Sequence, residues 1–313
     1  MIFRNTFRLL FSNFSNVWKL LLYYIICTAL TAFVCGWFVV PVVRELADAN
    51  VFKDLVDVIG NFFSNTPSSS AYTLQEISER VVDIFAVHVE FKAYTLFTII
   101  WLVLVFPITL DLSSLALGEV LYGYMTSQVK YSFSGRFVKN LGKSLSYAIM
   151  RYALSIIINV LIVASFYGLL HFVVLGGLYI LLSIVMLAVM IVLCALKHTI
   201  FSCWMPAMAV LDMDVFAALK MNTKTVVRKF FAIFSNMLLL EFMAIVVNLI
   251  FGVFTASVSL IVTLPLTIFV FEIARMVSFF FAHGMRFYVY PDMFISPKKF
   301  EEQDSIVRIK NLV

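Results

Sequence analysis

Charged side chains are scarce in this sequence. Only 13% of the 313 residues are Asp, Glu, Lys or Arg, whereas 63% are hydrophobic. An ordinary soluble domain carries about twice that charged fraction. The composition therefore excludes a soluble globular domain and predicts a polytopic membrane protein. Its apolar runs are continuous, whereas barrel strands alternate, so the predicted fold class is all-α.

Signatures of catalysis are also missing. The sequence holds no Walker A loop, no G-x-S-x-G elbow, no H-E-x-x-H pair and no dinucleotide-binding fingerprint. An intramembrane enzyme would need a nucleophile or a metal triad that the residue spacing does not show. We therefore expect a protein that is not an enzyme and that carries no cofactor.

Cysteine and histidine are too few and too scattered to predict a metal centre. The four cysteines include no C-x-x-C pair, so neither a zinc site nor a disulfide framework is indicated. Three of them lie inside apolar runs, where they are expected to pack as small hydrophobic side chains. His88 and Glu90 come nearest to a pair of ligands, and we expect no metal there.

Six apolar runs are each long enough to cross a membrane. About 20 helical residues, rising about 1.5 Å each, span the roughly 30 Å of hydrocarbon in a bilayer. The six predicted spans are Leu20–Val43, Tyr94–Leu117, Leu145–Leu170, Val173–Leu196, Met237–Phe254 and Val258–Phe281.

A short segment recurs in front of these runs. Arg8–Asn16 and Arg228–Asn236 share the pattern Arg-x-x-Phe-x-x-Phe-Ser-Asn, and 139–147 is a weaker third copy. Such internal similarity indicates a duplicated architecture. We predict three tandem hairpins, each preceded by a basic interfacial helix, and the first such helix at 1–19 has apolar residues at helical spacing.

The basic residues predict the orientation. Lys and Arg concentrate at the ends of the runs that would share one side with the amino terminus. The opposite side holds only Arg44, Lys53, Arg80 and Lys92. The positive-inside rule then places both termini on the cytoplasmic side of the membrane. The basic inner face predicts anionic lipid head groups as partners and requires no nucleic acid.

The predicted chain forms a single membrane domain over 1–313. Its parts outside the spans are an extracytoplasmic helical hairpin at 44–93, a cytoplasmic segment at 197–236 and a cytoplasmic tail at 284–313. The hairpin contains a capping box at Thr73–Glu76, which opens its second helix. The tail after Tyr290 is polar and is expected to be loosely ordered.

Five charged residues fall inside the predicted spans, at similar depth near the cytoplasmic side. Charges in such positions are costly unless they are paired or hydrated. Glu272 and Arg275 lie three residues apart on one helical face and are expected to pair. Arg151 would then take one further acid and leave the other without an arginine partner. These residues are Asp111, Arg151, Glu241, Glu272 and Arg275, here called the charged layer.

Two interpretations of the charged layer stay open. It could be a set of salt bridges that holds the three hairpins in register. It could instead line a polar cavity, open to the cytoplasm, for an ion, a proton or a lipid head group. Asn159 and Asn248 lie deeper, and would either extend such a path or bond between helices.

Two stretches of the sequence resemble a known family. They are Pro206-x-x-x-Val210-Leu211-Asp212 with Ala217-Ala218-Leu219-Lys220, and Gly118 with Gly135-Arg136-Phe137. These are similar to uncharacterised bacterial six-helix inner-membrane proteins related to the membrane domain of glycerophosphodiester phosphodiesterases. The resemblance implies a fold and little about function. Nothing matches the soluble phosphodiesterase domain, so that activity is not carried over, and the long outer hairpin departs from the family pattern.

On these grounds we predict a non-enzymatic integral membrane protein that assists envelope or lipid handling. One way for it to do so is as an accessory subunit of another membrane protein. Its expected lipid head-group contacts are Arg8, Arg136, Arg228 and Lys229. The alternative is a small transporter or lipid flippase that uses the charged layer.

Overall fold

The structure is a computed structural model that describes residues 2–54, 57, 76–77, 79–80, 83–84, 93–175, 180–255, 259–290 and 293–295. Within these residues, six helical stretches are long and apolar enough to cross a membrane. They are Ser15–Gly36, Phe97–Ser127, Leu141–Leu169, Leu181–Leu211, Val215–Gly252 and Leu260–His283. Each overlaps one predicted span, so the chain is an integral, multi-pass membrane protein.

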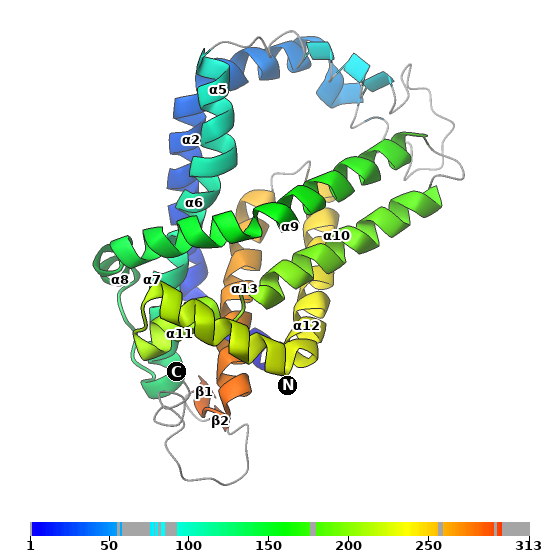
Figure 1. Ribbon diagram of the computed structural model, residues 1–313. Helices are drawn as coiled ribbons and strands as arrows, with labels where there is room; N and C mark the ends of the chain where they lie inside the picture. The colour runs from blue at the N-terminus through cyan, green and yellow to red at the C-terminus, as the bar shows by residue number, and fades with distance from the viewer. Residues whose placement is uncertain are drawn as a thin grey trace. The chain divides into compact units, whose positions relative to one another are not determined.

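The chain divides into two compact units (Figure 1). The first comprises Met1–Ile25, Ile108–Ile162 and Met190–Val313, and the second comprises Ile26–Pro107 and Val163–Val189. The elements, in chain order, are α1 (Ile2–Ser12), α2 (Ser15–Asp48), α5 (Ala93–Ile100), η1 (Trp101–Val105), α6 (Phe106–Asp111), α7 (Ser113–Ser127), α8 (Phe133–Lys139), α9 (Leu141–Leu175), α10 (Ile180–Ile200), α11 (Trp204–Leu211), α12 (Val215–Phe254), α13 (Leu260–His283), β1 (Phe287–Tyr290) and β2 (Met293–Ile295).

Helix α13 is at the centre of the first unit. Its second half is almost entirely buried, and α1, α7, α11 and α12 all pack against it. Phe269, Phe279 and Phe280 are fully enclosed. The core of this unit therefore surrounds the stretch of α13 that also carries Glu272 and Arg275.

The repeated segment corresponds to a recurrent local structure, a helix that breaks before a long apolar helix. Asn140 (φ −101°, ψ 9°) separates α8 from α9, and Lys229 (φ −121°, ψ 20°) interrupts α12. Both residues directly follow the basic residue that opens their copy, and both have the bridge-region backbone of a turn. In the first copy the break comes later, in the turn at 13–14 between α1 and α2.

Helix α1 is packed against the protein to a greater extent than the interfacial prediction requires. It buries Ile2, Leu9 and Leu10 against α13 and α12. The first backbone N–H groups of a helix lack partners within it, and here the Phe3 N–H donates to Asn236 Oδ1 at 3.1 Å. Phe11, 69% exposed, stays on the outer side and is free to meet lipid.

The segment predicted as a cytoplasmic connection, 197–236, contributes much of the core. Helix α11 is buried along nearly its whole length. Asn222 of α12 bridges the end of α10 and the start of α11. Its side chain accepts from the N–H of Cys203, the residue just before α11, at 2.9 Å and donates to the carbonyl of Ile200, the last residue of α10, at 2.7 Å. Gly118 of α7 permits close packing, since a Cβ there would stand 2.2 Å from Met205 Sδ.

In the second unit α2 and α5–η1 are joined by Trp101 Nε1, which donates to Thr31 Oγ1 at 3.3 Å. The η1 turn, a π-helical bulge, precedes Pro107, whose nitrogen has no hydrogen to donate. A small separate core contains Leu46, Val51, Ile77 and Ile84. Most of the predicted outer hairpin at 44–93, including 73–75 of its capping box, lies outside the described residues.

The predicted tail begins with ordered structure that the all-α prediction missed. Gly284 ends α13 in the left-handed conformation (φ 66°), and β1 and β2 then form an antiparallel pair in which Phe287 faces Ile295. Phe287 and Val289 are buried because the sequence Phe-Tyr-Val-Tyr alternates inward and outward. Residues 296–313 lie outside the described residues.

Candidate functional site

The charged layer is centred on an ion pair within α13. Arg275 Nη1 lies 2.5 Å from Glu272 Oε1, and both side chains are almost fully buried. Their spacing of three residues places both on the face of α13 that turns into the core. The predicted pairing of these two residues is confirmed.

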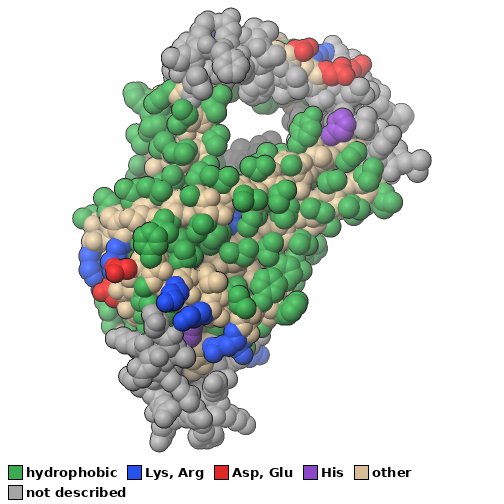
Figure 2. Space-filling model, viewed as in Figure 1, with side chains coloured by type: hydrophobic (Ala, Val, Ile, Leu, Met, Phe, Trp, Pro, Cys, Tyr) green, Lys and Arg blue, Asp and Glu red, His purple; other side chains and the backbone are tan. Residues whose placement is uncertain are grey.

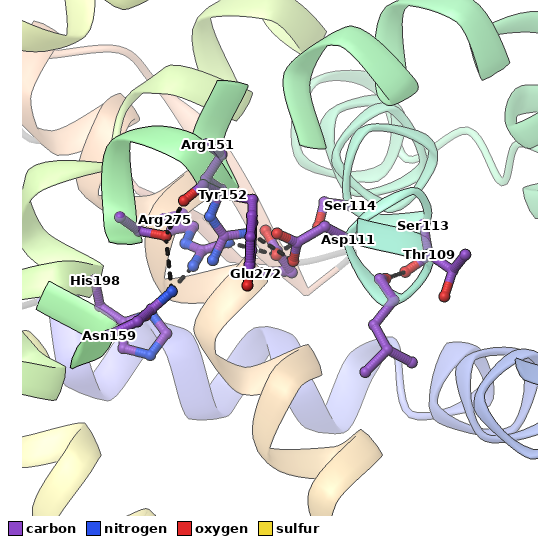
Figure 3. A network of polar contacts seen from close by, with 12 residues as sticks. Thr109, Asp111, Ser113, Ser114, Arg151, Tyr152, Asn159, His198, Glu272 and Arg275 are labelled. Atoms are coloured by element: carbon purple, nitrogen blue, oxygen red, sulfur yellow. Dashed lines mark hydrogen bonds and ion pairs between the residues drawn. The ribbon is translucent and has the colours of Figure 1, made fainter. Parts of the chain in front are cut away.

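Helix α7 supplies a second partner to the same carboxylate. Ser114 Oγ donates to Glu272 Oε1 at 3.0 Å. Ser114 is in the first turn of α7, just after the short break at Leu112. The serine hydroxyl therefore attaches α7 to α13 at the depth of the ion pair (Figure 3).

A second ion pair joins α6 to α9. Arg151 Nη1 lies 2.9 Å from Asp111 Oδ1. The arginine is the more buried of the two, and its guanidinium also approaches the Tyr147 ring, 6.0 Å from the centroid. Of the two acids that the sequence offered to Arg151, the structure selects Asp111.

Glu241 is consequently the acid without an arginine. It faces His198 of α10 instead, with Glu241 Oε2 3.6 Å from His198 Nε2. That separation is longer than a hydrogen bond, and the buried Oε2 atom has no hydrogen-bond partner among the described residues.

His198 connects this acid to the central pair. Its Nδ1 lies 3.1 Å from Arg275 Nη2, and its ring stacks on Phe271 with centroids 4.0 Å apart. In Figure 3, His198 and Arg275 point toward one another from α10 and α13. The contacts thus run from Ser114 through Glu272, Arg275 and His198 to Glu241.

Sequence reasoning missed His198 and Ser114. The predicted fourth span ended at Leu196, so His198 was assigned to the cytoplasmic segment, whereas α10 continues to Ile200. A helix one turn longer would have brought His198 to the depth of the charged layer. Ser114 carries no charge, and no pattern in the sequence distinguishes it.

The two deeper asparagines differ in their partners. Asn159 Nδ2 donates to Ser155 Oγ at 3.2 Å within α9. Asn248 Nδ2 donates to Thr267 Oγ1 at 3.0 Å and so joins α12 to α13. Of the two roles predicted for them, Asn248 fills the interhelical one.

The four basic side chains predicted to contact lipid head groups differ in how strongly other groups of the protein hold them. Arg136 is held by Glu119, at 2.8 Å, and lies over the Tyr131 ring. Arg8 and Arg228 each make one long contact, to Met293 Sδ and to the Ala282 carbonyl, both at 3.5 Å. Lys229 is exposed at the break in α12. Lys229 is therefore the most available of the four.

Exposed apolar side chains accompany these cations. Val227 and Phe231, on either side of Arg228 and Lys229, are 75% and 83% exposed. Figure 2 shows Lys and Arg side chains gathered along one border of the apolar surface of the first unit. A cationic border beside exposed apolar side chains is typical of a surface at the head-group level of a membrane.

Groups suited to hold a metal are not found in the part of the chain that the structure describes, where no three His, Cys, Asp or Glu residues come together. The four cysteines are free thiols.

No family model, no curated protein and no solved structure matches the chain. The resemblance to the phosphodiesterase-related membrane family therefore stays a prediction from short motifs.

Proposed function

We propose that this chain is a non-enzymatic protein of a bacterial plasma membrane, with both termini in the cytoplasm, that assists envelope or lipid handling through anionic head groups on its cytoplasmic face. The observation that carries the proposal is the exposed pair Arg228 and Lys229, flanked by exposed Val227 and Phe231. Each Lys or Arg near an anionic membrane surface contributes about 1 kcal/mol of attraction.

The pairing within the charged layer favours a structural role for most of it. Asp111, Arg151, Glu272 and Arg275 already neutralise one another inside the first unit. A buried ion pair is costly to break, because the remaining partner keeps an uncompensated charge. The lipid role is accordingly assigned to the cationic border rather than to the layer.

Native mass spectrometry of the full chain in mild detergent tests the lipid role. The protein is mixed with equal amounts of phosphatidylglycerol and phosphatidylethanolamine. We expect the anionic lipid to be enriched on the wild type. The double variant Arg228→Gln/Lys229→Gln should lose about tenfold or more of this preference, since two contributions of about 1 kcal/mol are removed.

Arg44→Gln/Lys53→Gln is the matched control, because both residues are exposed and belong to the second unit. It removes the same charge and should leave the preference intact. Equal retention of both lipids by the wild type would contradict the proposal. If a second protein stays bound when the chain is extracted from its native membrane, the chain acts as an accessory subunit of that protein.

A small transporter or flippase is the second candidate. It is favoured by the Oε2 atoms of Glu241 and Glu272, which have no hydrogen-bond partner among the residues that the structure describes. Buried carboxylate oxygens without a donor are typical of sites that bind a proton or a cation. This candidate predicts that Glu241→Gln abolishes transport in proteoliposomes while the thermal unfolding midpoint is unchanged. A folded variant with full transport would exclude Glu241 as the site.

A further inference from the structure

A pocket lies where the turn between α1 and α2 meets the end of α7. It encloses about 320 Å³ of space, its open mouth included. The residues that line it are Ser12, Asn13, Ser15, Asn16, Lys19, Val120, Tyr124, Lys130 and Tyr131. None of these residues is acidic, two are lysines, and six of the others carry a hydroxyl or amide. The lining thus favours an anion.

Two buried side chains in the lining have donors that are not used. Asn16 and Tyr124 are each 6% exposed. Asn16 Oδ1 accepts from Lys19 Nζ at 3.0 Å, but Asn16 Nδ2 and the Tyr124 hydroxyl have no hydrogen-bond partner in the described part of the chain. Neither atom is among the fully enclosed side-chain atoms that lack a partner, so both keep some surface open to the pocket that they line and are available as donors to a ligand there.

The start of α2 adds a favourable field. Ser15 and Asn16 form the first turn of this 34-residue helix and lie in the pocket wall. The N–H groups of Asn16 and Val17 already donate to the carbonyls of Asn13 and Phe14, so the helix start contributes the partial positive charge of its dipole, which favours anions. Lys19 is one turn further along and extends the same cationic wall.

The opposite wall is fixed by a turn that follows α7. Gln128 ends the helix in the left-handed conformation (φ 57°), and the chain then returns so that the Tyr131 ring lies over Gly123. A Cβ on Gly123 would stand 2.3 Å from that ring. Glycine at this position therefore allows Lys130 and Tyr131 to close the pocket.

We propose that this pocket binds a phosphate group, held by Lys19 and Lys130 and by the free donors of Asn16 and Tyr124. A lipid head group and free inorganic phosphate share this chemistry. The lipid form of the site rests on the lipid-handling function proposed above, whereas the free-phosphate form does not.

The test uses the full chain in mild detergent with three probes, which are inorganic phosphate, short-chain phosphatidic acid, and short-chain diacylglycerol as the control without phosphate. Affinity is measured by thermal-shift titration at constant ionic strength. Lys19→Gln/Lys130→Gln should weaken phosphatidic acid binding by about tenfold or more, because charge-assisted hydrogen bonds are lost. Tyr124→Phe, which removes only the hydroxyl, should weaken binding several-fold.

Arg44→Gln/Lys53→Gln is the charge-matched control and should leave the affinity unchanged, since both residues are exposed, belong to the second unit and do not line the pocket. Binding of phosphatidic acid alone identifies a lipid head group, and binding of both phosphate probes identifies a general phosphate site. The proposal is overturned if the pocket variant keeps its affinity, if the control loses as much, or if diacylglycerol binds equally well.

The two proposals can fail separately. Pocket-dependent binding of inorganic phosphate without enrichment of phosphatidylglycerol would remove the lipid function and keep the site. Enrichment of phosphatidylglycerol that depends on Arg228 and Lys229, together with unchanged affinity of Lys19→Gln/Lys130→Gln for both phosphate probes, would keep the lipid function and remove the site.

Discussion

Arg275 Nη2 and His198 Nδ1 lie 3.1 Å apart in the core of the first unit. A guanidinium group can only donate, so His198 must accept at Nδ1. A neutral imidazole that accepts at one nitrogen carries its proton on the other, and Nε2 faces Glu241 Oε2. The geometry thus assigns the tautomer of His198 and makes it the link between the ion pair of α13 and the acid of α12.

Substitutions of His198 should separate these two contacts. His198→Leu leaves an Arg275 donor and the Glu241 carboxylate without the ring, and an unsatisfied buried polar group costs about 1–3 kcal/mol. His198→Asn keeps an acceptor near the position of Nδ1 and should cost less. Thermal unfolding in detergent measures both. His171→Leu, at an exposed position of the second unit, should change the midpoint little.

Equal loss of stability in His198→Leu and His198→Asn would contradict the acceptor role, because the two differ mainly in the acceptor that faces Arg275.

The ion pair of α13 should behave as a coupled unit. Arg275→Met leaves Glu272 buried without its cation and should cost about 3–5 kcal/mol. Glu272→Leu/Arg275→Met removes both charges and should recover most of that loss. A double-mutant cycle by thermal unfolding measures the coupling. A double variant that is stable and keeps the phenotype of the wild type would establish a structural role for this pair.

Additive losses in the cycle would contradict this expectation. A double variant that is stable but does not transport in proteoliposomes would instead support the transporter candidate, because the charges would then be needed for something other than folding.

The sequence was sufficient to predict the six apolar helices and one of the ion pairs. The spans follow from apolar length alone, and Glu272 with Arg275 follows from helical spacing. The choice of Asp111 for Arg151 depends on how α6 and α9 approach each other, and no local rule determines that. His198 was missed because helix ends are the least certain part of a sequence-based assignment.

The packing of α11 could not be predicted for a different reason. Its sequence is uniformly apolar and carries no helical periodicity, so nothing indicates which neighbours it meets. Its position depends on Gly118 of α7 and on the side chain of Asn222, residues far apart in the sequence.

Gly118 should therefore be sensitive to a single added methyl group. In Gly118→Ala the new Cβ would approach Met205 Sδ to 2.2 Å and Ala209 Cβ to 3.3 Å. Met205 is flexible, so part of the clash is relieved, and the expected cost of the overpacking is about 1–3 kcal/mol. Gly142→Ala, where nothing lies within 4 Å of the Cβ, is the control and should be neutral or slightly stabilising.

The test of Gly118 is thermal unfolding of both alanine variants, with Gly118→Ala/Met205→Ala as the compensating pair. Recovery of stability in that pair locates the strain at the contact between α7 and α11. A Gly118→Ala protein as stable as the Gly142→Ala protein would show that the two helices do not need this close approach.

The ion pair between Lys143 and Asp212 should give a small acid-dependent contribution to stability. Lys143 Nζ lies 2.7 Å from Asp212 Oδ1, and this hydrogen bond, with the charge of Lys143, lowers the pKa of Asp212 below its ordinary value of 3.8. A carboxyl whose pKa is lower in the folded state stabilises the fold fully above its unfolded pKa. That contribution is lost as the pH falls through the folded pKa.

Because the Asp212 side chain is 91% exposed, solvent screening limits the effect to a few tenths of a kcal/mol. Asp212→Asn tests it well, since asparagine tolerates the left-handed backbone at this position (φ 52°). The difference in unfolding midpoint between wild type and variant should be largest above about pH 4 and should vanish on further acidification. A difference that grows as the pH falls would show that the carboxyl is destabilising, and would assign the ordering of this turn to the backbone of Asp212 alone.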